Sequence, residues 1–323
     1  MIKKAATMVI GLLLFYVGCS LALDLPEAKV AVKVIDENDK PVEGVKVLIG
    51  FLSRQGVDGR IKEVAEKGIT TVDGLFTATK RTTEHIAFSA DKEGYYKSNG
   101  EYYFKSHENG RWIPWNMTIP VVLRKIIDPV PMFARDTQMS PLPPLVSDKE
   151  VGFDLIEYDW VAPYGKGKSS DFRVKINMNY KNEEDYEYRL AITFPNKFDG
   201  IQLVKEDLKS GSHFKLPRRA PESGYQNRLV KYMKKIPNMP EEKNYEENVG
   251  YIFRIRSEER NGQLVRAMYG KIQGDIRFSI KNSNSASILF KYYLNPSYST
   301  NLEYDVNKNL FSNLKSYERV RLY

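Results

Sequence analysis

From residue 29 to residue 51, valines and isoleucines recur at every second position on both sides of a polar stretch that ends at Pro41. A period of two with β-branched side chains is typical of strands, and a proline, which lacks the backbone N–H, fits a turn between them. Residues 68–78 repeat the arrangement around Asp73-Gly74, a pair that favours a tight hairpin. The pattern predicts that a β-sandwich opens with two hairpins, and that the polar residues 54–67 form an insertion between strands.

The same motifs resemble one known family. A strand is followed by D-x-x-x-x-P-V-x-G-V-x-V from Asp36, by T-x-D-G-x-F from Thr71, and by the pair Gly94-Tyr95. This order resembles the carboxypeptidase regulatory-like, or transthyretin-like, domain. The resemblance covers residues 28–124 and implies a small antiparallel β-sandwich without catalytic residues of its own.

A proline-rich stretch separates this region from the rest of the chain, and we interpret residues 125–147 as a linker. Such proline density disfavours helix and favours an extended connection. The prolines are Pro129, Pro131, Pro141, Pro143 and Pro144.

Strand patterns return over residues 148–323, in about eight short runs without alternating helical patterns, which predicts a second β-sandwich rather than a parallel α/β fold. Phrases such as DPVPM and DWVAPYGKG resemble segments of uncharacterised exported bacterial proteins, which implies no activity. The fold class expected for the chain is therefore all-β, with two antiparallel β-sandwich domains joined by a Pro-rich linker.

One long interruption divides the second domain. Residues 206–248 are rich in lysine, arginine and proline, which predicts a long basic insertion outside the sandwich core. Within it, residues 225–236 carry a pattern that predicts a short basic helix.

The N-terminus predicts export. Lys3 and Lys4 precede an apolar stretch too short to cross a bilayer, which is typical of a signal peptide over residues 1–22. Cleavage after Ala22 would give a soluble protein that begins at Leu23. The alternative is a lipoprotein with an acylated Cys19, and this is the only route to a membrane that the sequence offers. The expected location is the periplasm, the cell envelope or the medium.

The composition bears on disulfide bonding, solubility and possible partners. Cys19 is the only cysteine, so a chain cleaved after Ala22 has no disulfide and depends on its buried core. The formal charge of +8 arises from charges of both signs spread along the chain, which indicates solubility rather than a binding surface. Nucleic acid is not expected as a partner of an exported protein.

No catalytic motif is evident, and no cofactor is predicted. Residues 162–169 fit a loose phosphate-loop expression, but a strand pattern follows where that chemistry needs a helix. His85, His107 and His213 show no ligand spacing, so no metal site is predicted.

Several aromatic and basic side chains could bind a ligand, since exposed rings can stack on sugars, although packing is the more common role of a large ring. The candidates are Trp112, Trp115, Trp160, Tyr164, Arg218 and Arg219. The leading hypothesis is an exported, non-catalytic β-sandwich protein with an envelope, surface or assembly role, whose partner is a polysaccharide or another envelope protein. The alternatives are a glycan-binding module and, third, a carbohydrate-active enzyme.

Overall fold

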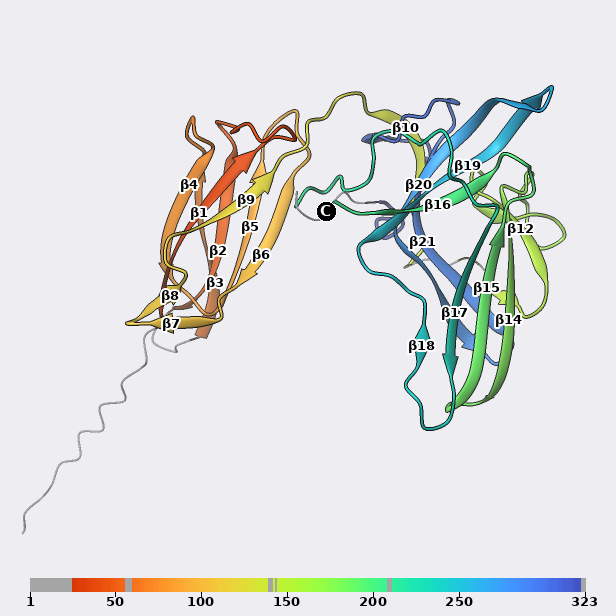
Figure 1. Ribbon diagram of the computed structural model, residues 1–323, viewed down its shortest axis with the longest axis horizontal. Coiled ribbons are helices and arrows are strands. Elements are labelled where there is room, and N and C mark those ends of the chain that lie inside the picture. Colours follow the sequence, from red (N-terminus) through yellow and green to blue (C-terminus); the bar gives the residue numbers. More distant parts are fainter. Residues whose placement is uncertain (1–24, 56–59, 139–141, 143, 208–210, 321–323) are drawn as a thin grey trace, which may run out of the picture.

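The computed structural model describes residues 25–55, 60–138, 142, 144–207 and 211–320 of the chain. These residues contain twenty-two strands and no helix, which confirms the all-β class. The strands form two β-sandwich bodies that lie side by side (Figure 1). The predicted signal peptide, with Cys19 and both cleavage sites, lies outside the described residues.

The first domain packs two sheets face to face. One has the order β4-β1-β8-β7, with β9 also pairing with β1, and the other has the order β3-β2-β5-β6. β1 is antiparallel to β4 but parallel to β9, so this sheet is mixed. The strands are β1 (Glu27–Ile35), β2 (Lys46–Gln55), β3 (Arg60–Ile69), β4 (Leu75–Arg81), β5 (His85–Asp91), β6 (Ser98–Tyr103), β7 (Ser106–Glu108), β8 (Arg111–Ile113) and β9 (Met117–Val122).

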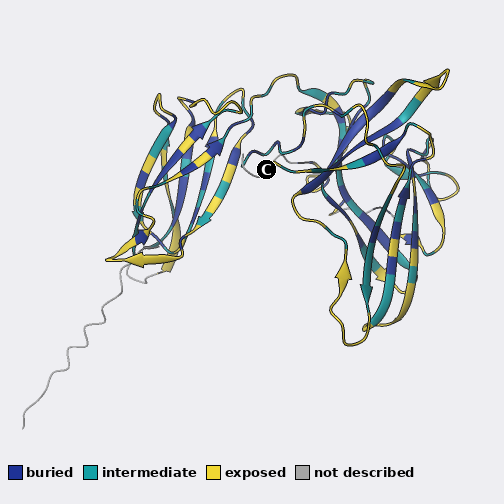
Figure 2. Ribbon diagram, viewed as in Figure 1, coloured by how far each residue is buried: buried dark blue, intermediate teal, exposed yellow. Residues whose placement is uncertain are grey.

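The two runs predicted as an opening hairpin are strands, but the hairpin itself was a wrong prediction. β1 and β2 belong to different sheets, and so do β3 and β4 on either side of Asp73-Gly74. Each run buries its alternate valines and isoleucines in the same core, from opposite sides, as the buried stripes in Figure 2 illustrate. Alternation shows which face of a strand is buried but not which strand pairs with it. Residues 60–67, predicted as part of a polar insertion, belong to edge strand β3, which pairs with β2 along its whole length.

The second domain also has two sheets. The larger has the order β16-β19-β20-β21-β10-β22, with β11 on β21, and the smaller has the order β13-β12-β14-β15-β17-β18. A largely aromatic and aliphatic core lies between them, with Phe153, Tyr251, Phe253 and Phe290 almost fully buried. The strands are β10 (Val130–Asp136), β11 (Leu145–Val146), β12 (Glu150–Asp154), β13 (Asp159–Trp160), β14 (Phe172–Asn182), β15 (Asp185–Thr193), β16 (Gly200–Lys205), β17 (Arg228–Lys235), β18 (Glu242–Lys243), β19 (Val249–Arg260), β20 (Gln263–Asn282), β21 (Ser285–Asn295) and β22 (Tyr304–Asn309).

The stretch predicted as a linker differs from the prediction in part. Residues 130–136 form β10, which lies between β21 and β22 in the larger sheet. Met132 and Ala134 are fully buried, and Pro131 is exposed at a break in the register with β22. A proline is tolerated in a strand at such an irregularity, so the proline density concealed a strand.

The predicted basic helix over residues 225–236 was wrong, since residues 228–235 form β17, which pairs with β15 and β18. Leu229 and Met233 pack against the core, and Lys231 lies buried between them in the period of the strand. A lysine at an inward position disguises the alternation, and its charge is matched by a residue 44 positions away, Asp275.

Candidate functional site: the domain junction

The two domains are joined a second time, far from the linker in the sequence, by residues 211–218 of the second domain, which we call the docking segment. It extends the first domain's sheet at the free edge of β6. Ser98 and Ser212 form an antiparallel bridge. The backbone N–H of Asn99 donates to the carbonyl of Gly211 at 2.9 Å, and that of His213 donates to the carbonyl of Lys97 at 2.9 Å. This is strand addition within one chain, and it covers part of an edge that would otherwise be open.

Phe214 is the apolar anchor of the docking segment. It is buried, and its ring stacks on Tyr96 of the first domain with centroids 4.8 Å apart and planes inclined by 16°. Arg124, which follows β9, places Nη1 2.6 Å from the carbonyl oxygen of Phe214 and 3.1 Å from that of Leu216, donating to both. An aromatic contact and a charged donor therefore hold the same short piece of chain.

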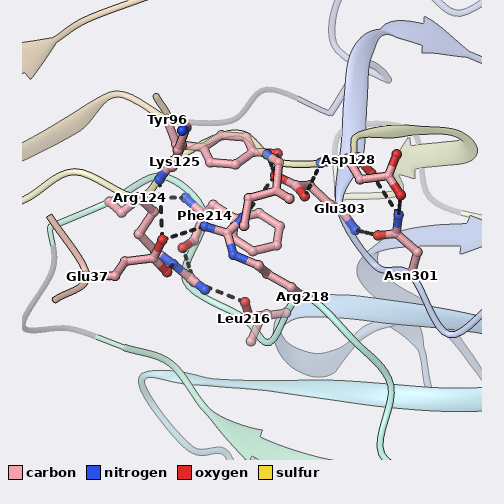
Figure 3. Close-up of polar contacts among 12 residues, drawn as sticks. Glu37, Tyr96, Arg124, Lys125, Asp128, Phe214, Leu216, Arg218, Asn301 and Glu303 are labelled. Carbon is pink, nitrogen blue, oxygen red and sulfur yellow. Dashed lines mark hydrogen bonds and ion pairs between the residues drawn. The ribbon is translucent and has the colours of Figure 1, made fainter. Parts of the chain in front are cut away.

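Two carboxylates and two guanidinium groups surround this anchor (Figure 3). Glu37, in the turn between β1 and β2, accepts from Arg124 Nε at 2.9 Å and from Arg218 Nη2 at 2.7 Å. Arg218 also donates through Nη1 to Glu303 at 2.9 Å. In the order in which they are bonded, Arg124, Glu37, Arg218 and Glu303 alternate in charge, and the charges neutralise one another across the junction.

Glu303 fixes the linker as well as the docking segment. Its carboxylate accepts from the Tyr96 hydroxyl at 3.0 Å and from the backbone N–H groups of Ile127 and Asp128 at 2.9 Å each. Together with Arg218, four donors converge on one side chain that is almost fully buried. Such a carboxylate is satisfied, and buried charges of this kind stabilise a structure only when they are fully paired.

The pKa directions agree with this geometry. Burial opposes ionisation of Glu37, but hydrogen bonds from Arg218 and Arg124 outweigh it and hold the pKa below its usual value. Burial, and then the negative charge and hydrogen bond of Glu303, raise the pKa of the Tyr96 hydroxyl. Both groups therefore keep at neutral pH the protonation state that the contacts require.

Lys271 of β20 lies at the same place, where it forms no ion pair with any residue that the structure describes. Its Nζ is 4.1 Å from the centroid of the Phe214 ring and 4.9 Å from that of Tyr293. Burial, the largest cause, and the nearby charge of Arg124 lower the pKa of this lysine to about 7, against the opposing charge of Glu303.

The residues singled out in the sequence are scattered, and of these only Arg218 lies in the cluster of charges at the junction. Trp112 is buried, donates from Nε1 to the carbonyl of Thr82 at 2.9 Å, and lies in β8 at the end of the first domain far from the docking segment (Figure 1). Trp115 is partly buried beneath Arg111, whose guanidinium carbon is 4.7 Å from its ring.

The other three candidates lie in the second domain. Trp160 is buried against Phe153, with centroids 5.1 Å apart. Tyr164 is 49% exposed. Arg219, next to Arg218, is exposed and forms a backbone bridge with Asn301. The three tryptophans therefore form no common platform.

The glycine-lysine loop at residues 162–169 is organised around carboxylates. Asp154 accepts from the backbone N–H groups of Lys168 and Ser169 at 2.9 Å each, and Asp159 accepts from that of Lys166 at 2.8 Å. These are the donors that a phosphate would need, and strand β14 follows the loop where a phosphate site needs a helix. The side chains of the protein therefore already occupy the anion position.

Sequence reasoning missed Glu37, Tyr96, Arg124, Glu303 and Lys271. Their partners are far apart in the chain, with 181 positions between Glu37 and Arg218 and 207 between Tyr96 and Glu303. The one local signal is Lys271 itself, the only charged residue between positions 267 and 274 of β20.

Within the described ranges, no group of three or more histidine, cysteine, aspartate and glutamate side chains is placed to hold a metal ion. Over the same part of the chain, no helix has the length and apolar character needed to cross a membrane.

No family model and no curated protein matches the chain. It is similar to the solved structure of a streptococcal ancillary pilin, with a TM-score of 0.23 and 13% identity over 81% of this chain and 58% of that one. It is also similar to BcpA, the major pilin subunit of Bacillus cereus, with a TM-score of 0.22 and 11% identity over 81% and 95% of the two chains.

A third similar structure is 3-chlorocatechol 1,2-dioxygenase from Rhodococcus opacus 1CP, with a TM-score of 0.27 and 12% identity over 32% of this chain. The match spans 62% of the dioxygenase, less than two thirds of its length. Similarity this low assigns no activity.

Proposed function

We propose that the chain is an exported, non-catalytic β-sandwich protein with a structural or assembly role in the cell envelope. The observation that carries the proposal is the junction. The docking segment extends the first domain's sheet by backbone pairing, and the charged groups around Phe214 are used to hold two bodies together. A chain that fixes the orientation of two sandwiches is suited to act as a stiff building element.

The paired carboxylates argue against an enzyme at this place. A general acid or base must reach its substrate and exchange a proton with it. Glu303 accepts from four donors and is almost fully buried, and Glu37 accepts from two guanidinium groups. Both carboxylates are therefore engaged by partners that hold the two domains together, and neither is placed to act on a substrate.

The aromatic residues support a glycan-binding role less well. A sugar stacks on an exposed ring face, but Trp112 and Trp160 are buried and Arg111 lies over Trp115. We therefore do not propose glycan binding, but the experiment below would reveal it.

Cell fractionation with crosslinking tests the role directly. A photoreactive residue replaces Val72 in the first domain or Met239 in the second, which are 70% and 60% exposed. After irradiation of whole cells, we expect the chain in the envelope fraction, beginning at Leu23, with covalent adducts to another envelope protein.

The unmodified chain, irradiated in the same way, is the control. Recovery of the chain only from the cytoplasm would overturn the proposal. If the chain hydrolyses any member of a polysaccharide panel, a carbohydrate-active enzyme would replace the proposed structural role. Retention on an insoluble polysaccharide that is lost in Trp115→Ala, without loss of thermal stability, would replace it with a glycan-binding module.

A further inference from the structure

Lys271 lies on the face of the larger sheet that the docking segment covers. Its neighbour in β20, Ile272, points into the core of the second domain, so Lys271 points to the opposite face, as does its register partner Tyr293. Docking-segment residues 213–216 line, with Lys271 and Tyr293, a void of only about 10 Å³. Lys271 is 3% exposed, and this segment lies over it.

The charges around Phe214 balance only when Lys271 is neutral. The guanidinium carbons of Arg124 and Arg218 are 4.7 Å and 5.3 Å from the Phe214 centroid, and Lys271 Nζ is 4.1 Å from it. Glu37 and Glu303 match the two arginines. In the described part of the chain Lys271 makes no ion pair, so its protonation adds a third cation to a buried cluster with two anions. A buried charge without a counter-ion is costly even beside aromatic faces.

We propose that Lys271 makes the domain junction sensitive to pH, so that protonation of its amine releases the docking segment and deprotonation allows the segment to close. The proposal rests on the junction geometry and is independent of the envelope role.

The direction in which pH shifts the opening equilibrium follows from the difference between the pKa of Lys271 in the closed and in the open junction. In the closed junction the lysine's pKa is lowered to about 7, and an exposed lysine keeps the ordinary value of 10.5. The open state therefore binds more protons between these two values, and acidification favours opening. From pH 9 to pH 7 the opening constant should rise about 50-fold, and it should change little further below pH 7.

Other titratable and charged groups face the same space from every element packed there. They are Glu37, Tyr96, Arg124, Glu206, His213, Lys215, Arg218, Tyr293 and Glu303. The low pKa of Glu37 and the high pKa of Tyr96 keep both outside the window from pH 7 to pH 9. Histidines change charge near pH 6.5, so His213 requires a control variant.

Thiol labelling measures the opening. Ser212 is fully buried in the docking segment, and Ser106 is exposed in β7. In the full chain carrying Ser106→Cys and Ser212→Cys, peptide-resolved mass spectrometry gives the alkylation rate at each position. The ratio of the two rates removes the intrinsic pH dependence of the thiol and reports the opening constant. We expect this ratio to rise about 50-fold from pH 9 to pH 7.

Lys271→Met should remove the rise of the labelling ratio, because a methionine side chain cannot be protonated. Lys271→Gln repeats the test with a neutral polar side chain. Lys205→Met, which removes an exposed lysine paired with Glu246, and His213→Gln should both keep it. A ratio independent of pH in the parent chain would overturn the proposal. So would a rise that persists in Lys271→Met and Lys271→Gln, or one that disappears in His213→Gln.

Discussion

Lys231 and Lys271 are each 3% exposed, one in the core of the second domain and the other at the junction. Lys231 Nζ lies 2.7 Å from Asp275 Oδ1, and that carboxylate also accepts from the Tyr251 hydroxyl at 2.5 Å. Lys271 faces two aromatic rings, and among the residues that the structure describes it forms no ion pair. At equal burial, one lysine therefore has a carboxylate within ion-pair distance, whereas burial lowers the pKa of the other, so the two amines differ in their partners and not in their exposure.

The two regions also differ in what can move. Lys231 and Asp275 lie on strands of the two sheets of one sandwich, so separating them requires that the core open. Lys271 is covered by a short segment that pairs with another domain, and lifting the segment exposes it without unfolding either sandwich. Proteins can open locally at such a segment at a lower free energy than the global unfolding that would separate a pair in the core.

The largest effect should come from Asp275→Asn. Loss of the carboxylate leaves Lys231 charged and buried without a counter-ion, which should lower the free energy of unfolding of the second domain by about 3–5 kcal/mol. Urea denaturation followed by intrinsic fluorescence measures the loss. The double variant Lys231→Met with Asp275→Leu removes both charges and should recover most of it. A single variant as stable as the parent would show that the pair is not buried as the structure has it.

The second effect separates the two lysines by pH. Because the pKa of Lys271 is lowered on folding, the unfolded chain binds the extra proton, and stability rises with pH between pH 7 and 10.5. From pH 7 to pH 9 the gain should be about 2 kcal/mol relative to Lys271→Met. Denaturant unfolding at several pH values measures the slope in both chains. Parallel curves for the two chains would contradict the unpaired lysine.

The strands of this fold are readable from local alternation, and the junction is not. Residues 172–180 alternate apolar and polar side chains and form the greater part of β14. β17 was not predicted as a strand because Lys231 occupies an inward position. That position is possible because Asp275, 44 residues away, pairs with the lysine. A sequence pattern over a few neighbouring residues cannot show that a charge among them is neutralised by a residue far away in the chain.

The junction was unpredictable for the same reason on a longer scale. Arg218 was a candidate only as part of a basic stretch, whereas its role depends on Glu37 and Glu303, which lie 181 and 85 positions away. The tryptophans were candidates for ligand binding because they are large aromatic side chains, but Trp112 and Trp160 are buried and serve in packing. Residue type predicts what a side chain can do, and only the pairing of distant elements decides which use it has.

A third, smaller effect concerns the junction pair. Glu37→Gln should weaken docking by about 1 kcal/mol, since the Glu37 side chain is 34% exposed and water screens part of the attraction to Arg218. The lowered pKa of Glu37 means that its contribution is present at neutral pH and is lost as the pH falls through the folded-state value, below 4.5. The labelling ratio at Ser212→Cys, measured at pH 9, reports the change. A double-mutant cycle with Arg218→Gln should return a coupling energy of similar size, and independent effects would contradict the ion pair.

The smallest effect should come from Lys243→Met, in β18, which pairs with β17, the strand that carries Lys231. Lys243 Nζ lies 3.3 Å from Glu241, and the two side chains are 50% and 33% exposed. The Tyr186 hydroxyl donates to the same carboxylate at 2.6 Å and is the main cause of its lowered pKa, so Glu241 keeps a partner when the lysine is removed. The loss in unfolding free energy should be below about 0.5 kcal/mol, by the same urea measurement as for Asp275→Asn. A loss above about 1 kcal/mol would mean that an exposed lysine on this hairpin contributes more than solvent screening allows, and that burial is not what separates Lys231 from its neighbours.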